Sequence, residues 1–302
     1  MTARSFVGLG PLQQHMETDG VREIMVTGGG RVWVEGAAGI RPAGALTADE
    51  TAAVIERITR FTGRRADLTS PVVDVRMEDG SRACVVLPPV AVDGPTVCIR
   101  RFSRSVLPLS AFTDGAGVTA LRGLVRSRAN IVVSGATSTG KTSLLAALVA
   151  AVPLRERIVT VEDTTELDPP NPHVVRLQTR PASADGVGAV SARDLVRASM
   201  RLRPDRLVVG EVRGGEVVDM LVALTSGHDG CMSTVHARSA ADARSRLVTL
   251  ALRENPQFGR VALEMLVHDA IDAVVHLERL GDGSRREASI DMTPRTPATA
   301  DG

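Results

Sequence analysis

The sequence predicts an α/β protein in which a largely parallel, doubly wound sheet follows a smaller α+β domain. After residue 129, stretches with strand character alternate with stretches of helical periodicity, which is typical of a parallel sheet with helices on both faces. The first strand of that series runs into a glycine-containing loop and then a helix. At roughly 150 residues per domain, a chain of 302 residues has room for about two domains.

The first hundred residues carry the pattern of the smaller domain. Residues 21–26 and 31–35 flank a three-glycine turn and predict a strand pair. Thr47 and Glu50 form a capping-box pattern, which predicts that a helix begins there. The apolar residues on one face of this helix are Val54, Ile55, Ile58 and Phe61. Further strands are predicted at residues 72–75, 82–87 and 96–101.

The larger domain begins with a predicted strand at residues 129–134 and a predicted helix at 142–152. Then come a strand at 157–161, a hairpin ending at 174–177, a helix capped at Ser191 with Asp194 in its first turn, and a strand at 205–211. The predicted division is a first domain at 1–102, a linker at 103–112, a second domain at 113–292 and a disordered tail at 293–302.

A phosphate-binding motif lies between the first strand and the first helix of the larger domain. Residues 135–142 read GATSTGKT and fit G-x-x-x-x-G-K-[ST], and Lys141 is the single lysine of the chain. In this motif the loop amides and the helix N-terminus hold the phosphates, the lysine bridges them and the Thr142 hydroxyl binds Mg²⁺. The residues predicted to bind nucleotide are Gly135, Ala136, Thr137, Ser138, Thr139, Gly140, Lys141, Thr142 and Ser143.

Three carboxylates follow strands of the predicted parallel sheet. Glu162 and Asp163 come after the first strand beyond the loop, and Glu211 comes after the next. Because the carboxyl ends of parallel strands share one edge, these side chains should lie at the edge that carries the loop, where they could hold Mg²⁺ or align a water. The alternative is that they are exposed turn residues. For His228 and His236, spacing alone leaves a structural and a catalytic role equally open.

Composition excludes several classes of protein. With 36 basic and 35 acidic residues and 2% aromatic residues, the chain lacks the overall charge and the stacking platforms of a nucleic-acid-binding protein. Its three cysteines have no disulfide or zinc spacing and are interpreted as small buried residues. The longest apolar run, residues 144–152, is shorter than the ~18 residues that span a bilayer, and the N-terminus lacks a secretory signal, so a cytoplasmic location is expected.

Four motifs in order resemble the secretion traffic ATPases of type II secretion, type IV pili and type IV secretion. They are a Walker A motif at 135–142, an Asp box at 160–167, an atypical Walker B motif at 207–214 and a His box at 227–237. Residues 173–177, 193–216 and 226–230 are most similar to the TadA/CpaF branch, which serves tight-adherence (Flp) pilus systems. The first domain resembles this branch through residues 21–28 and 79–102, so the likeness covers nearly the whole chain.

The resemblance implies a RecA-like ATPase domain and gives individual residues a role. Glu162 and Glu211 correspond to the acids that act on the attacking water, with Glu211 also at Mg²⁺, and which of them is the base stays open. His236 corresponds to the His-box residue near the γ-phosphate, with His228 supporting it. The arginines implied at the nucleotide are Arg82, Arg100 and Arg101 of the first domain and Arg213 beside Glu211, although solvated surface arginine is an equal alternative for each.

The expected function is Mg²⁺-dependent ATP hydrolysis by a homohexamer at the inner face of the plasma membrane. The resemblance implies an integral membrane platform protein as a partner and pilin-like subunits as the indirect substrate, with no direct nucleic acid contact. One alternative is a nucleotide-gated assembly factor with little turnover, because Ala136 and Ser138 replace glycines usual in relatives and could strain the loop. The other is a conjugation ATPase of type IV secretion. A GTPase is disfavoured because its guanine-reading motif needs a second lysine.

Overall fold

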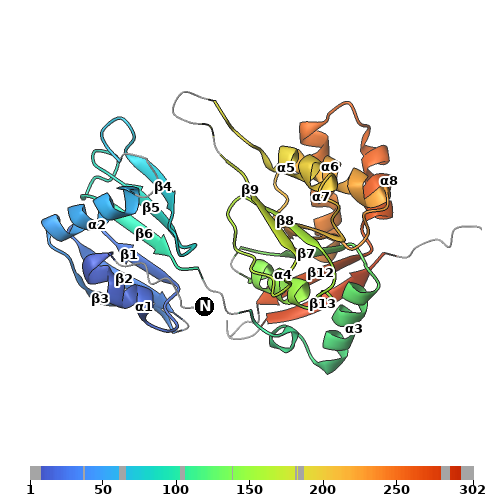
Figure 1. The fold of residues 1–302 in the computed structure, drawn as a ribbon, viewed down its shortest axis with the longest axis horizontal. Helices are drawn as coiled ribbons and strands as arrows, with labels where there is room; N and C mark the ends of the chain where they lie inside the picture. Colours follow the sequence, from blue (N-terminus) through green and yellow to red (C-terminus); the bar gives the residue numbers. More distant parts are fainter. Residues whose placement is uncertain are drawn as a thin grey trace, which may run out of the picture. The chain divides into compact units, whose positions relative to one another are not determined.

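The computed structural model describes residues 8–36, 38–60, 66–102, 106–137, 139–180, 182, 187–279 and 286–293. The chain forms two compact units, Met1–Arg104 and Ser105–Gly302, and each is described here by itself (Figure 1). In the described ranges no helix is both long and apolar enough to cross a membrane.

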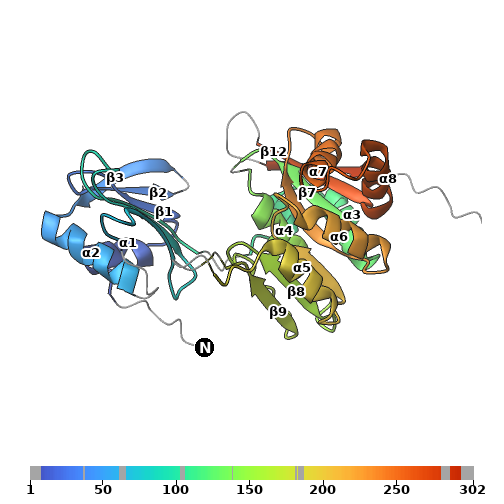
Figure 2. The same ribbon diagram turned by 90° about the horizontal axis from the view of Figure 1, so that it is seen from above.

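Unit 1 is an antiparallel sheet in the order β3-β2-β1-β6-β5-β4, with helices on one face (Figure 2). Its elements are η1 (Gly10–Leu12), α1 (Gln13–Glu17), β1 (Glu23–Val26), β2 (Arg31–Gly36), β3 (Gly39–Ala45), α2 (Ala48–Arg60), β4 (Val72–Arg76), β5 (Arg82–Val86) and β6 (Thr96–Arg100). Alternate strand residues are buried against the helices, which is the pattern of a sheet with one covered face.

The capping box at the start of α2 is confirmed. The Glu50 amide donates to Thr47 Oγ1 at 3.2 Å, and Glu50 Oε2 accepts from the Thr47 amide at 2.8 Å. The apolar face of α2 is buried at Val54, Ile55 and Ile58, whereas Phe61 lies outside the described residues. The sequence did not predict β3, because the glycines and the proline of GIRPAGA hide any alternation.

Unit 2 is a mixed sheet in the order β13-β12-β7-β11-β10-β8-β9, parallel except for β13. Its elements are η2 (Leu109–Ala111), α3 (Gly115–Arg126), β7 (Ile131–Gly135), α4 (Lys141–Ala150), β8 (Ile158–Glu162), β9 (Val174–Gln178), α5 (Ala192–Met200), β10 (Arg206–Val209), α6 (Glu216–Thr225), β11 (Met232–His236), α7 (Ala240–Glu254), α8 (Arg260–Ala270), β12 (Ala273–Arg279) and β13 (Arg286–Met292). The predicted largely parallel sheet is therefore present.

Each face of this sheet has its own hydrophobic core. Ile131 and Val133 of β7 pack in a cluster with apolar residues of α3 and α4, and Val132 between them packs in a second cluster with α5, α6, α7 and α8. Figure 1 shows these four helices gathered together. Because both faces are covered, the central strands are buried at every position and show no alternation of buried and exposed residues.

The predicted hairpin ending at residues 174–177 is wrong. β9 pairs with β8 in parallel, with Ile158 opposite Val174. Residues 163–173 must therefore carry the chain from the end of β8 back to the edge of the sheet where the parallel strands begin. Leu167 of this connection is buried in the core. Asn171 fixes its end by donating from Nδ2 to the Pro153 carbonyl at 3.0 Å.

Two segments predicted to be irregular are ordered at least in part. Leu109 and Phe112, placed in the linker by the sequence, are buried in the core below α3 and α4. Thr293, placed in the disordered tail, is buried, and its Oγ1 donates to the Ile271 carbonyl at 2.5 Å. The rest of that predicted tail lies outside the described residues.

A buried ion pair between Arg206 and Glu156 lies at the edge of this sheet where the parallel strands begin. The Arg206 side chain is fully buried and donates from Nε to Glu156 Oε2 at 2.6 Å and from a terminal nitrogen to the Val125 carbonyl at 2.7 Å. Arg206 thus links the start of β10 to the end of α3 and to the loop before β8.

We expect Arg206→Leu to destabilise the protein by about 3 kcal/mol, because it leaves the buried Glu156 carboxylate with only the half-exposed Arg128, whose Nη2 lies 3.6 Å from Oε2. The double variant Arg206→Leu/Glu156→Leu should regain most of that loss. Urea unfolding midpoints of the single and double variants measure both effects. A single variant within about 1 kcal/mol of the parent, in the same assay, would contradict this role for the pair.

Candidate functional site

The site lies where four parallel strands of unit 2 end side by side. β11 pairs with β7 so that His236 is opposite Gly135, and β10 pairs with β8 so that Val209 is opposite Val161. The sheet order β7-β11-β10-β8 places the phosphate-binding loop, the end of the His box and two carboxylate-bearing turns along one edge. Carboxyl ends of parallel strands are the usual place for ligands in such sheets.

The loop from β7 to α4 has the backbone of a phosphate cradle. Gly140 precedes α4 with a φ of 96°, in the left-handed region that favours glycine. No side chain caps the first turn of α4 in the part of the chain that the structure describes, so its amides are available to an anion. Ala136 does not have a positive φ, so the expected strain is not seen at this residue, and Ser138 lies outside the described residues.

Lys141 is buried at the start of α4 and faces the end of β11. Its Nζ donates to the Ala136 carbonyl at 2.8 Å and lies 3.0 Å from His236 Nδ1. Burial lowers the pKa of Lys141, while the nearby Glu211 carboxylate opposes that shift. An ammonium group has only donors, so Nδ1 of His236 accepts here and the ring proton is on Nε2.

His236 connects Lys141 to Glu211. Its Nε2 lies 2.9 Å from Glu211 Oε1, which is an electrostatic contact, because Oε1 accepts no hydrogen bond among the described residues. Burial lowers the pKa of His236, the Lys141 charge lowers it further, and Glu211 opposes them. The imidazole is therefore neutral at pH 7, with Nδ1 accepting from Lys141 and Nε2 close to the Glu211 carboxylate.

Arg213 extends this chain beyond Glu211. It donates from one terminal nitrogen to Glu211 Oε2 at 2.5 Å, and its other terminal nitrogen lies 3.5 Å from Asp163 Oδ2. The hydrogen bond with Glu211 raises the pKa of Arg213. Thr179 Oγ1 donates to Asp163 Oδ1 at 3.2 Å, which fixes the far end of the chain on the residue after β9.

Glu216 is a residue of the site that the sequence analysis did not identify. Its Oε1 accepts from the Arg213 amide at 2.6 Å and from the Gly214 amide at 2.8 Å, which pins the turn that carries Glu211 and Arg213. The signal was a glutamate at the first position of a helix, three residues after Arg213, but many helices begin this way.

Glu162 occupies a separate place at the end of β8. Its side chain is buried, and Oε1 accepts from the Glu166 amide at 2.8 Å and the Leu167 amide at 3.1 Å. Its Cγ is 2.9 Å from where a Cβ on Gly210 would lie, so the small residue before Glu211 makes room for it. Glu162 therefore lies next to the Glu211 turn.

Other predicted site residues are distributed as follows. Thr137 is exposed, Thr139 is buried, and Thr142 and Ser143 are partly exposed in the first turn of α4. Arg82, Arg100 and Arg101 belong to unit 1. Arg82 and Arg100 face each other across β5 and β6, and Arg101 donates to the carbonyls of Val21, at 2.8 Å, and Thr18.

The structure does not bring His228 to His236. This residue precedes β11, whereas His236 ends it, and the strand rise of about 3.3 Å per residue puts them more than roughly 13 Å apart at opposite edges of the sheet. The two histidines are close in sequence, but a strand separates them.

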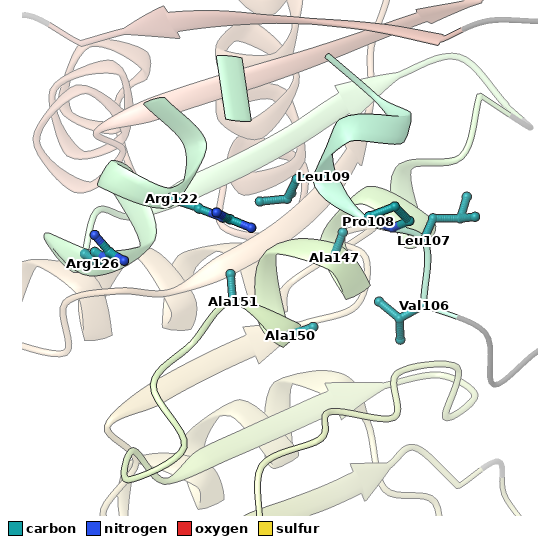
Figure 3. A pocket seen from close by; sticks show the side chains of 9 residues that line it. All are labelled: Val106, Leu107, Pro108, Leu109, Arg122, Arg126, Ala147, Ala150 and Ala151. Carbon is teal, nitrogen blue, oxygen red and sulfur yellow. The ribbon is translucent and has the colours of Figure 1, made fainter. Parts of the chain in front are cut away.

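Two hollows mark the surface of unit 2. One, of about 420 Å³, adjoins the site and is lined by Asp163, Thr179, Arg180, Ser191, Ala192, Glu211, Arg213, Gly214 and Glu216. The other, of about 440 Å³, lies between α3, the end of α4 and the segment before η2 (Figure 3). It is lined by apolar residues and by Arg122 and Arg126, away from the loop that holds Lys141, so the catalytic arrangement does not include it.

The residues present fit a nucleotide phosphate and Mg²⁺. The uncapped first turn of α4 and the Lys141 ammonium supply donors to phosphate oxygens. The Thr142 hydroxyl and the Glu211 carboxylate supply the oxygen ligands that Mg²⁺ prefers. Among the described residues no cluster of three histidine, cysteine or acidic side chains is placed to hold a metal ion.

Comparison with known proteins gives the family. Residues 6–300 match the family model described as "Type II/IV secretion system protein". The chain belongs to this family. It is 38% identical over 296 residues to a putative conjugal transfer protein of Mycobacterium tuberculosis, covering 94% of this chain and 84% of that protein. It is 36% identical over 300 residues to the type IV secretion system protein PtlH of Bordetella pertussis, covering 88% of each.

A solved structure supports the same assignment. The VirB11 ATPase of the Brucella suis type IV secretion system, crystallised with sulphate, is 26% identical with a TM-score of 0.54, covering 94% of this chain and 93% of that one. The predicted secretion ATPase superfamily and the predicted two-part α/β fold are confirmed. The likeness to the TadA/CpaF branch stays a prediction.

The two charged neighbours of His236, Lys141 and Glu211, predict how it titrates. Its pKa should lie below the ordinary value of about 6.5, should rise in Lys141→Met, which removes a neighbouring positive charge, and should fall further in Glu211→Gln. The pH dependence of the His236 ring resonances in NMR measures this. Glu264→Gln, on the outer surface of α8, is the matched control and should leave the pKa unchanged. A pKa of His236 that Lys141→Met does not move would contradict the contact.

Proposed function

We propose that this protein is a Mg²⁺-dependent ATPase of the secretion family. The observation that carries the proposal is the chain of contacts from Lys141 through His236 to Glu211 beside the phosphate-binding loop. Three motifs meet at one edge of the sheet. They supply Lys141 at the start of α4, His236 at the end of β11 and Glu211 in the turn after β10.

Each residue has a place in the reaction that we propose. Lys141 and the first-turn amides of α4 bind the β- and γ-phosphates. To do so, Lys141 gives up its hydrogen bond to the Ala136 carbonyl and donates to phosphate oxygens instead. Thr142 and Glu211 hold Mg²⁺, which, when bound, neutralises charge on the phosphate oxygens. Glu162 or Glu211 orients and deprotonates the attacking water, because both carboxylates lie at the adjoining ends of β8 and β10.

His236 and Arg213 then hold the Glu211 carboxylate in position. The Nε2 atom of neutral His236 lies beside Oε1, and Arg213 donates a hydrogen bond to Oε2, so the carboxylate is held between the two side chains. When Lys141 turns to a phosphate, His236 Nδ1 loses its donor and becomes able to accept from a group near the γ-phosphate. This links nucleotide binding to the position of the Walker B acid.

The active assembly that we propose is a ring-shaped homohexamer on an integral membrane platform protein. The candidates to neutralise negative charge on the nucleotide phosphates are Arg82, Arg100 and Arg101 of unit 1, either of the same subunit or of a neighbour. We propose that the work is the assembly or movement of pilin-like subunits of a tight-adherence pilus, on the strength of the sequence likeness in residues 173–177, 193–216 and 226–230.

A second candidate role is type IV secretion of the conjugation type. The names of the relatives favour it, since one is a putative conjugal transfer protein and another a type IV secretion protein. The near-neutral charge and the scarcity of aromatic residues disfavour direct contact with DNA, so in this role too the chain would act on other proteins.

Steady-state ATP hydrolysis as a function of protein concentration tests the enzymatic proposal. We expect a specific rate that rises with concentration, because neighbours complete the sites, and that falls by about 10²-fold or more in Lys141→Ala. Lys141→Arg should also fail, because a guanidinium does not fit the loop. Arg260→Ala, on the outer surface of α8, should keep the parent rate.

ATP binding without turnover at any concentration would contradict the proposal and support the nucleotide-gated assembly factor instead. A particle with the mass of a single chain at saturating ATP, by analytical ultracentrifugation, would contradict the hexamer.

A chromosomal Lys141→Ala variant tests what the motor does in the cell. We expect the variant chain to accumulate normally while the surface filaments seen by electron microscopy are lost, because assembly needs hydrolysis. Filaments that persist while DNA or protein transfer stops would overturn the pilus role and support the conjugation-type role.

A further inference from the structure

Two cysteines of unit 1 face each other across neighbouring strands. Cys84 of β5 and Cys98 of β6 are direct partners in the antiparallel register. They occur among the alternate residues that point away from the helices, and both thiols are partly exposed. The odd number of cysteines and the lack of disulfide or zinc spacing predicted three small buried residues, which is wrong for Cys84 and Cys98 and confirmed for Cys231.

Their geometry meets the requirement for a disulfide. The Cα atoms of directly opposed antiparallel residues lie about 4.5–5.5 Å apart, and disulfides join Cα atoms about 4.4–6.8 Å apart. Both side chains point to the same face of the sheet, because opposed residues share a face. A disulfide also needs Cβ atoms about 3.5–4.5 Å apart, against about 4.5–5.5 Å for opposed residues, so β5 and β6 need to approach each other only slightly at this pair.

The surroundings of the pair keep both thiols protonated. The pKa of Cys84 is raised by burial, by the Asp74 carboxylate, which is its partner on β4, and by Cys98 itself. The pKa of Cys98 is raised by burial and by Glu23, although Arg100 opposes this. The thiolate fraction at neutral pH is therefore small, so exchange with a disulfide is slow and speeds up as the pH rises.

We propose that Cys84 and Cys98 form a reversible modification site, at which a small-molecule disulfide oxidises the two thiols to an intramolecular disulfide. One thiolate attacks a sulfur of the reagent and releases one reduced thiol. The other cysteine thiolate then attacks the protein sulfur of the mixed disulfide, forms the Cys84–Cys98 bond and releases the second reduced thiol. The protein loses two electrons and two protons, and the reagent gains them.

Cys231 provides an internal control. It is buried at the start of β11, and burial raises its pKa to about 12. A thiol in that state does not exchange in the folded protein. The site thus predicts selective loss of two of the three thiols.

The experiment treats the reduced full-length protein with oxidised glutathione at about pH 8.5, followed by alkylation in denaturant, trypsin digestion and mass spectrometry. No lysine or arginine lies between residues 83 and 99, so both cysteines fall in one tryptic peptide, residues 83–100. We expect this peptide to become lighter by two hydrogens, to resist alkylation and to regain both thiols with dithiothreitol. The peptide that contains Cys231 should be fully alkylated.

Matched variants make the outcome specific. Cys84→Ser and Cys98→Ser should each keep one bound glutathione or one free thiol and never give the lighter peptide, whereas Cys231→Ala should behave like the parent. Alkylation of both Cys84 and Cys98 after full exposure to the oxidant, or a separate glutathione on each, would overturn the proposal. So would linkage of two chains through residues 83–100 as the sole oxidised product. Dibromobimane, which becomes fluorescent when it bridges two neighbouring thiols, should label the parent and neither serine variant.

Discussion

The parallel pairing of β11 with β7 is the constraint on which the site depends. It sets His236 opposite Gly135, at the strand end where the phosphate-binding loop begins. β11 enters between β7 and β10, so the side chain that ends it can reach Lys141 on one side and Glu211 on the other. A shift of one residue in this register would turn the imidazole to the other face of the sheet and break both contacts.

The charges along this edge alternate in sign. Lys141, neutral His236, Glu211, Arg213 and Asp163 follow one another. Hydrogen bonds join Lys141 to His236 and Arg213 to Glu211, and close electrostatic contacts make the other two links. Such a network lets two cations and two carboxylates share a partly buried place without an uncompensated charge. It also lets a bound nucleotide affect Glu211 indirectly. A phosphate that binds Lys141 removes the hydrogen-bond donor of His236, and His236 contacts Glu211.

Residues of the site that belong to a motif or follow a predicted strand could be identified from the sequence. Contacts that depend on how distant segments pack could not. Glu211 was identified because a strand end places a side chain at a known edge, Lys141 because of the loop motif, and His236 because of the family resemblance. His228 was misplaced, since closeness in sequence hides the strand that separates it from His236. Glu216 was missed because its role is to accept amides of a turn. The β8–β9 hairpin was wrong because an irregular connection can return to either edge, and the Cys84–Cys98 pair requires the register of two strands.

The central claim is that His236 and Glu211 act as one unit at the γ-phosphate, and a double-mutant cycle on ATP hydrolysis tests it most directly. The rates of His236→Ala, Glu211→Gln and the double variant are measured on the full chain at saturating ATP, with Glu264→Gln as a surface control. The account predicts that the double variant is no slower than the slower single variant, since either change alone breaks the contact. Losses that multiply in the double variant would show that the two residues act independently and would contradict the account.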